Sequence, residues 1–167
     1  MTCHKKALDI NPADEIAWTY VAECQYRIGG KPESLRYYDR AIRANSKHRA
    51  AWTGKAKVLI ELARFDEAIE CLDIALMLNP DDPATVNMKA VALCRSHRQH
   101  EAIPLFDSLL ATNAGDMDVL WTNKGNALAE LGNWPEALPC FNRALAVNSN
   151  YGPARSQRDL ALRQLRK

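Results

Sequence analysis

The side chains with the sharpest chemical spacing in this sequence are Cys94, His97 and His100, which follow one another at three-residue intervals. Cysteine and histidine at short spacing are ligands of zinc, but a structural zinc site needs four ligands, usually as two separated pairs. Cys94 also ends one predicted helix whereas His100 begins the next, so their side chains are expected to diverge. The competing interpretation is an exposed turn with two histidines. We therefore predict no metal, with these three residues as the candidate ligands if one is bound.

Signatures of catalysis are absent from the sequence, which contains no GxGxxG, GxxxxGK[ST], GxSxG or HExxH motif. Its acidic clusters, such as Asp66-Glu67 and Asp81-Asp82, lie at predicted helix boundaries. Carboxylates near helix amino termini are favoured by the helix dipole, so capping explains them. These observations predict a protein that is not an enzyme and that needs no cofactor.

Charge and hydropathy argue against two further classes of function. The 22 Lys and Arg residues nearly balance the 20 Asp and Glu residues, for a net charge of +2. Binding to nucleic acid or to anionic membranes usually requires a stronger positive charge. No uninterrupted apolar run exceeds five residues, and the amino terminus has no apolar stretch of secretory-signal length. We therefore expect a cytoplasmic protein that binds neither nucleic acid nor membrane.

The elements that must position these side chains follow a period of 34 or 35 residues. Trp18, Trp52, Val86 and Trp121 open four similar blocks, and we number each block so that these residues occupy position four. Small residues recur at positions eight and twenty, and bulky ones at position twenty-four. Position eight holds Ala22, Ala56, Ala90 and Gly125; position twenty holds Ser34, Ala68, Ala102 and Ala137; position twenty-four holds Tyr38, Leu72, Phe106 and Phe141; position twenty-seven holds Ala41, Ala75, Leu109 and Ala144.

Small and bulky residues that alternate at helical spacing predict two antiparallel helices in each block. Small residues let the backbones approach, and large ones fill the gaps between them. The turns between the helices are predicted in the middle of each block, at Gly29-Gly30, Ala63-Arg64, His97-Arg98 and Gly132-Asn133. Each block is therefore predicted to form a helical hairpin.

This pattern of tryptophan, small residues, an aromatic residue and alanine resembles the tetratricopeptide repeat family, and the resemblance covers nearly the whole chain. It is strongest in WTNKGNALAELGNWPEALPCFNRALAVNS, residues 121–149. The resemblance implies a single all-α domain, a right-handed superhelical solenoid of antiparallel helix hairpins. The implied repeats are residues 15–48, 49–82, 83–117 and 118–151.

Position seven departs from the family pattern in three blocks. It is commonly leucine in the family, but here it is Lys55, Lys89 and Lys124. We expect this change to shift some apolar packing to a neighbouring position without changing the architecture.

Both ends of the array have a predicted role. Residues 1–14 align with the tail of a preceding, truncated repeat, which would leave an apolar N-terminal edge that favours self-association. Residues 152–167 are predicted to form one capping helix, with Ala154, Ala161, Leu162 and Leu165 on one face. We interpret its arginines as solvated surface rather than as a functional basic patch.

The five cysteines are predicted to be free thiols. Cys3, Cys71 and Cys140 occupy the same position of alternate repeats, and packed helices about 9 Å apart place them beyond disulfide reach. Cys24 and Cys94 lie in first helices and are expected to be small, half-buried apolar side chains. This usage favours a reducing compartment.

The family resemblance implies that the first helices of successive repeats line a concave groove. Asn123 and Asn126 resemble the asparagines with which family members hold a peptide backbone, because an amide can both donate and accept hydrogen bonds. Each is equally well explained as a solvated polar residue. Tyrosine and methionine in the groove would supply adaptable apolar contacts. The predicted peptide-binding residues are Tyr20, Glu23, Arg27, Lys57, Asn87, Met88, Arg95, Asn123, Asn126 and Glu130.

The two-carboxylate clamp of some family members, which binds a peptide C-terminus, is not reproduced. Position nine reads Glu23, Lys57, Val91 and Asn126, and position two has no lysine. We therefore predict a non-catalytic protein–protein interaction module that binds a peptide or protein segment in its groove. The alternative is a regulatory or dimerising segment of a larger enzyme or signalling protein.

Overall fold

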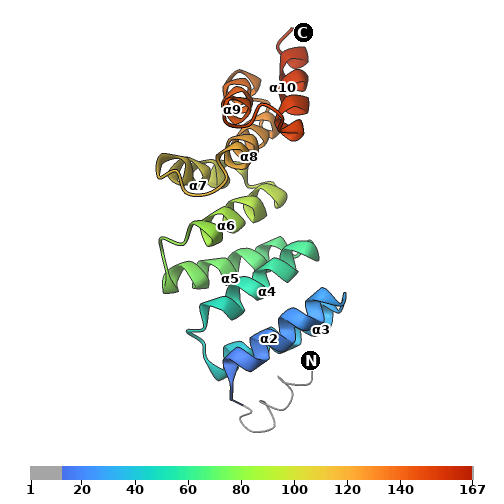
Figure 1. Ribbon diagram of the computed structural model, residues 1–167, viewed down its shortest axis with the longest axis vertical. Helices are drawn as coiled ribbons and strands as arrows, with labels where there is room; N and C mark the ends of the chain where they lie inside the picture. Colours follow the sequence, from blue (N-terminus) through green and yellow to red (C-terminus); the bar gives the residue numbers. More distant parts are fainter. Residues whose placement is uncertain (1–12, 167) are drawn as a thin grey trace. The chain divides into compact units, whose positions relative to one another are not determined.

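The computed structural model describes residues 13–166, and that part of the chain is built from helices and short connections without a strand (Figure 1). The all-α prediction is confirmed. The predicted tail of an earlier repeat, its apolar edge and Cys3 fall on or among residues 1–12, outside the described residues. The helices are α2 (Glu15–Arg27), α3 (Lys31–Ala44), α4 (Arg49–Glu61), α5 (Phe65–Leu78), α6 (Pro83–Arg95), α7 (Gln99–Ala111), α8 (Met117–Glu130), α9 (Trp134–Val147) and α10 (Gly152–Gln164).

The chain divides into two compact units, residues 1–85 and 86–167, and the division falls in the first turn of α6. In the first unit α2 packs on α3, α3 on α4, and α4 on α5. In the second unit α7 packs on α8, α8 on α9, and α10 on both α9 and α8. In each unit, therefore, a helical hairpin packs against the next helix along the chain.

The core of both units lies at the positions that the periodicity predicts. All four residues at position eight and all four at position twenty are buried, including the hydroxyl side chain of Ser34. Tyr38, Leu72, Phe106 and Phe141 at position twenty-four are among the largest fully buried side chains. The predicted alternation of small and bulky core residues is confirmed.

The turn in the middle of each block is a Schellman motif. Its left-handed residue is at position fifteen: Gly29, Ala63, His97 and Gly132 have φ of 90°, 57°, 60° and 77°. In each case the next residue donates its backbone N–H to a carbonyl five residues back, at 2.9–3.0 Å. The left-handed conformation costs a residue with a Cβ roughly 1–2 kcal/mol, so two of the four turns are strained.

We predict that Ala63→Gly and His97→Gly each raise the free energy of unfolding by about 0.5–1 kcal/mol. Removing the Cβ relieves the left-handed strain, and the extra freedom of glycine in the unfolded chain offsets only part of this gain. Both side chains are exposed, so no packing is lost. Urea unfolding followed by circular dichroism measures the change.

The reverse variant Gly132→Ala is the matched control. A Cβ at Gly132 would meet nothing within 4 Å, so its effect is conformational alone and should be destabilising. A loss of stability in both glycine variants would contradict the assignment of strain to this turn.

Close approach of helices demands glycine at two further sites. A Cβ on Gly125 would lie 2.5 Å from the ring of Phe141, and one on Gly54 would lie 2.5 Å from the ring of Tyr38. Both rings are fully buried and cannot move aside without disturbing the core. The two glycines thus set how near α8 comes to α9 and how near α4 comes to α3.

Gly125→Ala is therefore expected to lower the free energy of unfolding by up to about 2 kcal/mol. Overpacking costs about 1–3 kcal/mol, which outweighs the gain of about 1 kcal/mol from better helix propensity. Gly152→Ala, where a Cβ meets nothing within 4 Å, should show no such loss. Equal stability of the two variants in thermal unfolding would show that the Phe141 ring does not exclude a Cβ at position 125.

Two of the lysines at position seven, Lys55 and Lys124, form ion pairs with the preceding repeat. Lys55 Nζ lies 2.7 Å from Asp39 Oδ1, and Lys124 pairs in the same way with Asp107. Both aspartates occupy position twenty-five. The departure from leucine that the sequence shows at position seven is thus matched by an acidic partner one repeat earlier.

Helix α10 covers the last hairpin through two small residues, Ala154 and Ala161, which are fully buried. The predicted apolar face was too wide, because Leu162 and Leu165 are 37% and 44% exposed. Small residues allow α10 to lie close on α8 and α9, which turns the larger leucines toward solvent.

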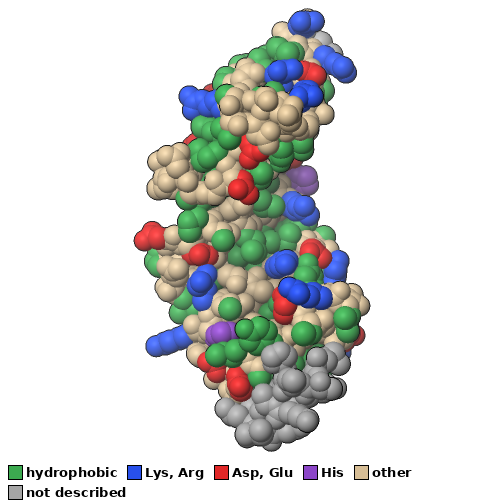
Figure 2. Space-filling view, in the orientation of Figure 1, with side chains coloured by type: hydrophobic (Ala, Val, Ile, Leu, Met, Phe, Trp, Pro, Cys, Tyr) green, Lys and Arg blue, Asp and Glu red, His purple; other side chains and the backbone are tan. Residues whose placement is uncertain are grey.

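Figure 2 shows acidic and basic side chains interspersed with apolar ones over the face in view. None of the described helices is long and apolar enough to cross a membrane.

Candidate functional site in the first helices

The predicted binding residues divide between the two units. Those of the first unit lie on α2 and α4, and those of the second on α6 and α8. In the second unit, Arg95, Asn123, Asn126 and Glu130 line one cavity. Asn87 and Met88 are half-buried on α6 but do not line it. The structure therefore places four of the ten predicted residues at one site.

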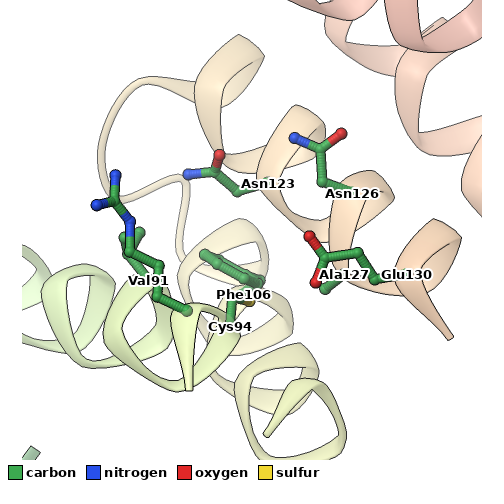
Figure 3. A pocket seen from close by; sticks show the side chains of 8 residues that line it. Val91, Cys94, Phe106, Asn123, Asn126, Ala127 and Glu130 are labelled. Atoms are coloured by element: carbon green, nitrogen blue, oxygen red, sulfur yellow. The ribbon is translucent and has the colours of Figure 1, made fainter. Parts of the chain in front are cut away.

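The cavity has a volume of about 180 Å³ and lies between α6, α7 and α8 (Figure 3). Its apolar walls come from Val91 and Cys94 on α6, Phe106 on α7 and Ala127 on α8. In Figure 3 the two asparagine amides and the Glu130 carboxylate extend from α8 around these walls. The combination of an apolar interior and a few polar groups is typical of a ligand site.

The carboxylate of Glu130 is held in place by a buried amide. Gln99 Nε2 donates to Glu130 Oε2 at 2.5 Å, and the Gln99 side chain is only 6% exposed. Its second bond, to the backbone carbonyl of Cys94, is long at 3.5 Å. A buried glutamine requires hydrogen-bond partners, so this residue and the carboxylate orient each other. Sequence reasoning missed Gln99, which reads as an ordinary polar residue at the start of α7.

Asn123 and Asn126 lie three residues apart on α8 and so share one face of the helix. The Oδ1 atom of Asn126 is buried and has no hydrogen-bond partner among the described residues. Leaving a buried polar atom unpaired costs about 1–3 kcal/mol. Turning the amide about its last torsion would exchange the buried oxygen for the nitrogen. One end of the Asn126 amide is thus left without a partner from the described residues, beside the cavity.

The Cys94 thiol is part of the apolar wall. Burial raises its pKa to about 11, and the nearby Glu130 carboxylate acts in the same direction. The thiol is therefore protonated at neutral pH and is a poor nucleophile and metal ligand. Cys24, Cys71, Cys94 and Cys140 are free thiols, as predicted.

The candidate zinc ligands are not assembled into a site. His97 occupies the left-handed turn after α6, and His100 is exposed in the first turn of α7. Within residues 13–166 no group of three or more His, Cys, Asp and Glu side chains is placed to hold a metal ion. The turn between Cys94 and His100 directs the three side chains apart.

In the first unit the corresponding side chains bind one another. The Tyr26 hydroxyl donates to Glu61, Lys31 Nζ lies 3.0 Å from Glu61 Oε2, and Lys57 Nζ lies 4.9 Å from the centre of the Tyr26 ring. Glu23 accepts from Arg27 at 3.1 Å and from the Tyr38 hydroxyl at 3.2 Å. The predicted residues Glu23, Arg27 and Lys57 thus belong to an internal network.

The electrostatics of this network follow from its contacts. The hydrogen bond to Glu61 raises the pKa of Tyr26 to about 12, and the same bond lowers the pKa of the Glu61 carboxyl, with help from Lys31. Tyr20, the remaining predicted residue, is 53% exposed. At these positions the side chains of the first unit pair with one another, whereas those of the second unit line a cavity.

Two other hollows contain charged groups that are already paired. One, in the first unit, is lined by the Lys55–Asp39 pair and by Arg64 with Glu67. The other, between α8 and α9, is lined by Trp121, against which Lys124 and Arg143 lie as cation–π partners. These contacts pair most of the charged groups in the two hollows, although Arg36 also lines the first and Glu136 the second.

The geometry is that of a helical-hairpin repeat protein with a small cavity between the first helices of its second unit. Sequence models described as tetratricopeptide repeat match residues 32–91 and residues 119–151, together more than half of the chain. The chain belongs to the tetratricopeptide repeat family. It is accordingly a protein–protein interaction module, of a family that typically serves as a non-catalytic scaffold. No curated protein matches this sequence.

Several solved structures share the fold at low sequence identity. YrrB, described as a TPR protein with an unusual peptide-binding site, is 20% identical with a TM-score of 0.82, and the match covers 98% of this chain and 84% of that one. MamA of Desulfovibrio magneticus RS-1 is 14% identical with a TM-score of 0.79 and 90% coverage of each chain. A tetratricopeptide repeat protein of Parabacteroides merdae is 19% identical with a TM-score of 0.85. There the match covers 97% of this chain and 64% of the other.

Reactivity of Cys94 tests the environment of the cavity. A pKa of about 11 in place of the ordinary value of 9.0 lowers the thiolate fraction at pH 8 about 100-fold. Alkylation of Cys94 by iodoacetamide, followed by peptide mapping, should therefore be about 100-fold slower in the folded protein than in urea. Its rate should rise about tenfold per pH unit until pH 11.

The Glu130→Gln variant provides the control, because losing the carboxylate removes a negative charge that disfavours the thiolate. Cys94 should then react faster than in the wild type. A folded-state rate equal to the rate in urea would show that the thiol is not buried in this way.

Proposed function

We propose that the protein binds an extended peptide segment along its first helices and that Asn123 and Asn126 hold the peptide backbone. The observation that carries this proposal is the cavity of the second unit, where two amides on one face of α8 border an apolar interior. An extended peptide presents alternating N–H and C=O groups, and an amide side chain can pair with both. YrrB, which has the same fold, is described as having a peptide-binding site.

The unsatisfied Oδ1 of Asn126 supports a role in binding rather than in stability. A bound peptide would supply hydrogen-bond partners to this amide, whose Oδ1 has none among the described residues. The half-buried side chains of Val91 and Cys94 would then contact a side chain of the peptide. The role proposed is recognition, in which the protonated thiol of Cys94 serves as an apolar contact.

The test begins with selection of 12-residue peptides from a random phage-displayed library on the immobilised protein. Selected peptides should bind the Asn123→Ala/Asn126→Ala double variant about 10–100-fold more weakly, as measured by fluorescence anisotropy. Each lost hydrogen bond contributes about 0.5–1.5 kcal/mol, and each 1.4 kcal/mol is a tenfold change in affinity.

The melting temperature of the double variant should be unchanged or higher, since Asn126→Ala removes a buried unpaired oxygen. Asn142→Ala, at an exposed asparagine of α9, is the matched control and should bind normally. Unchanged peptide affinity in the double variant would remove these two residues from the binding site.

A further inference from the structure

We propose that the cavity of the second unit receives a basic side chain of the bound peptide, lysine or arginine, with its cationic end against Glu130. This inference rests on the proposed function and specifies the chemistry of its ligand. The basis for this inference is the first unit, where the corresponding glutamate is paired with side chains of the chain itself.

The two places correspond position by position in the repeats. Each is formed by one block and the first helix of the block that follows it. Position thirteen of the following block is a glutamate in both units, Glu61 in the first and Glu130 in the second. The residues around this glutamate differ: Tyr26, Lys31 and Lys57 in the first unit are replaced by Cys94, Gln99 and Asn126 in the second.

In the first unit the glutamate is neutralised from within. Glu61 accepts the Tyr26 hydroxyl and pairs with the Lys31 ammonium at 3.0 Å. The ammonium of Lys57 lies over the Tyr26 ring at 4.9 Å. The chain thus places cationic groups and an aromatic ring around this carboxylate.

In the second unit each of these partners is smaller or uncharged. Cysteine in place of Tyr26 leaves space, and neutral amides in place of Lys31 and Lys57 leave the carboxylate without a cation. Glu130 has no ion pair with any residue in the described part of the chain. The space that remains is the cavity of about 180 Å³.

The cavity retains what a cationic side chain needs. The Glu130 carboxylate is oriented in advance by the buried Gln99, at 2.5 Å, which lowers the cost of binding. Val91 and the protonated thiol of Cys94, which are half-buried, offer apolar contact to the methylene groups of lysine or arginine. A charge-assisted hydrogen bond to a carboxylate is stronger than a neutral one.

Arg95 also lines the cavity, on the α6 side, and carries the opposite charge. Both Arg95 and Glu130 are open to solvent, so a ligand can reach either. The difference is that a buried amide fixes the carboxylate, whereas no hydrogen bond or ion pair within residues 13–166 fixes the guanidinium. The oriented group therefore defines the preferred charge of the ligand.

The test uses the peptides selected from the random library on the full chain. These peptides should share a lysine or arginine at one aligned position. Replacing it with norleucine, which keeps an apolar chain but loses the charge, should weaken binding to the wild-type protein at least 10-fold. This comparison needs no protein variant, so it does not depend on the folding of a mutant.

Two variants localise the effect. Glu130→Gln should lose the preference for lysine over norleucine. Gln99→Lys should do the same, because it gives Glu130 the internal partner that Lys31 gives Glu61. Asn150→Lys adds the same charge at an exposed residue outside the cavity and should keep the preference.

The outcomes separate the two proposals. The selected peptides could depend on Asn123 and Asn126 and yet share no basic position, or lose no affinity when lysine is replaced by norleucine. Either result would overturn the inference but leave the proposed function standing. A preference for lysine that persists in both Glu130→Gln and Gln99→Lys would also overturn it. Failure of any peptide to depend on Asn123 and Asn126 would instead count against the proposed function itself.

Discussion

The structure depends on the packing of a small residue against a bulky one at the crossing of two helices. Wherever position eight or twenty presents alanine, serine or glycine, the ring or leucine at position twenty-four fills the space and is buried almost completely. Gly125 and Phe141 show the limit of this arrangement, since even one methyl group would not fit between them. Because this contact fixes the spacing inside each hairpin, residues outside it are free to vary.

That freedom explains how one repeated element produces two different sites. The same positions carry Tyr26, Lys31 and Lys57 in one unit and Cys94, Gln99 and Asn126 in the other, on helices of similar length. In the first unit the side chains complete one another's hydrogen bonds and charges. In the second unit, we propose, a carboxylate and an amide are completed by the ligand. Substitution at a few positions thus distinguishes a surface whose polar groups pair with one another from the surface that we propose binds a peptide.

Most of the fold could be predicted from the sequence because it arises from local periodicity. The small and bulky core positions and the turns between helices all follow from spacing along the chain. The width of the apolar face of α10 could not be predicted, because exposure of Leu162 and Leu165 depends on how closely Ala154 and Ala161 let the helix approach. Gln99 was missed for a similar reason, since its burial is set by contacts with a helix about thirty residues away.

The direct measurement of peptide binding at this site is a nuclear magnetic resonance titration of the side-chain amides of Asn123, Asn126 and Gln99 with a selected peptide. Our account predicts that all three amide resonances shift together and saturate at one peptide per chain, while the exposed amide of Asn142 on α9 stays unchanged. Saturable binding that leaves the three amides unmoved would place the peptide elsewhere and contradict the account.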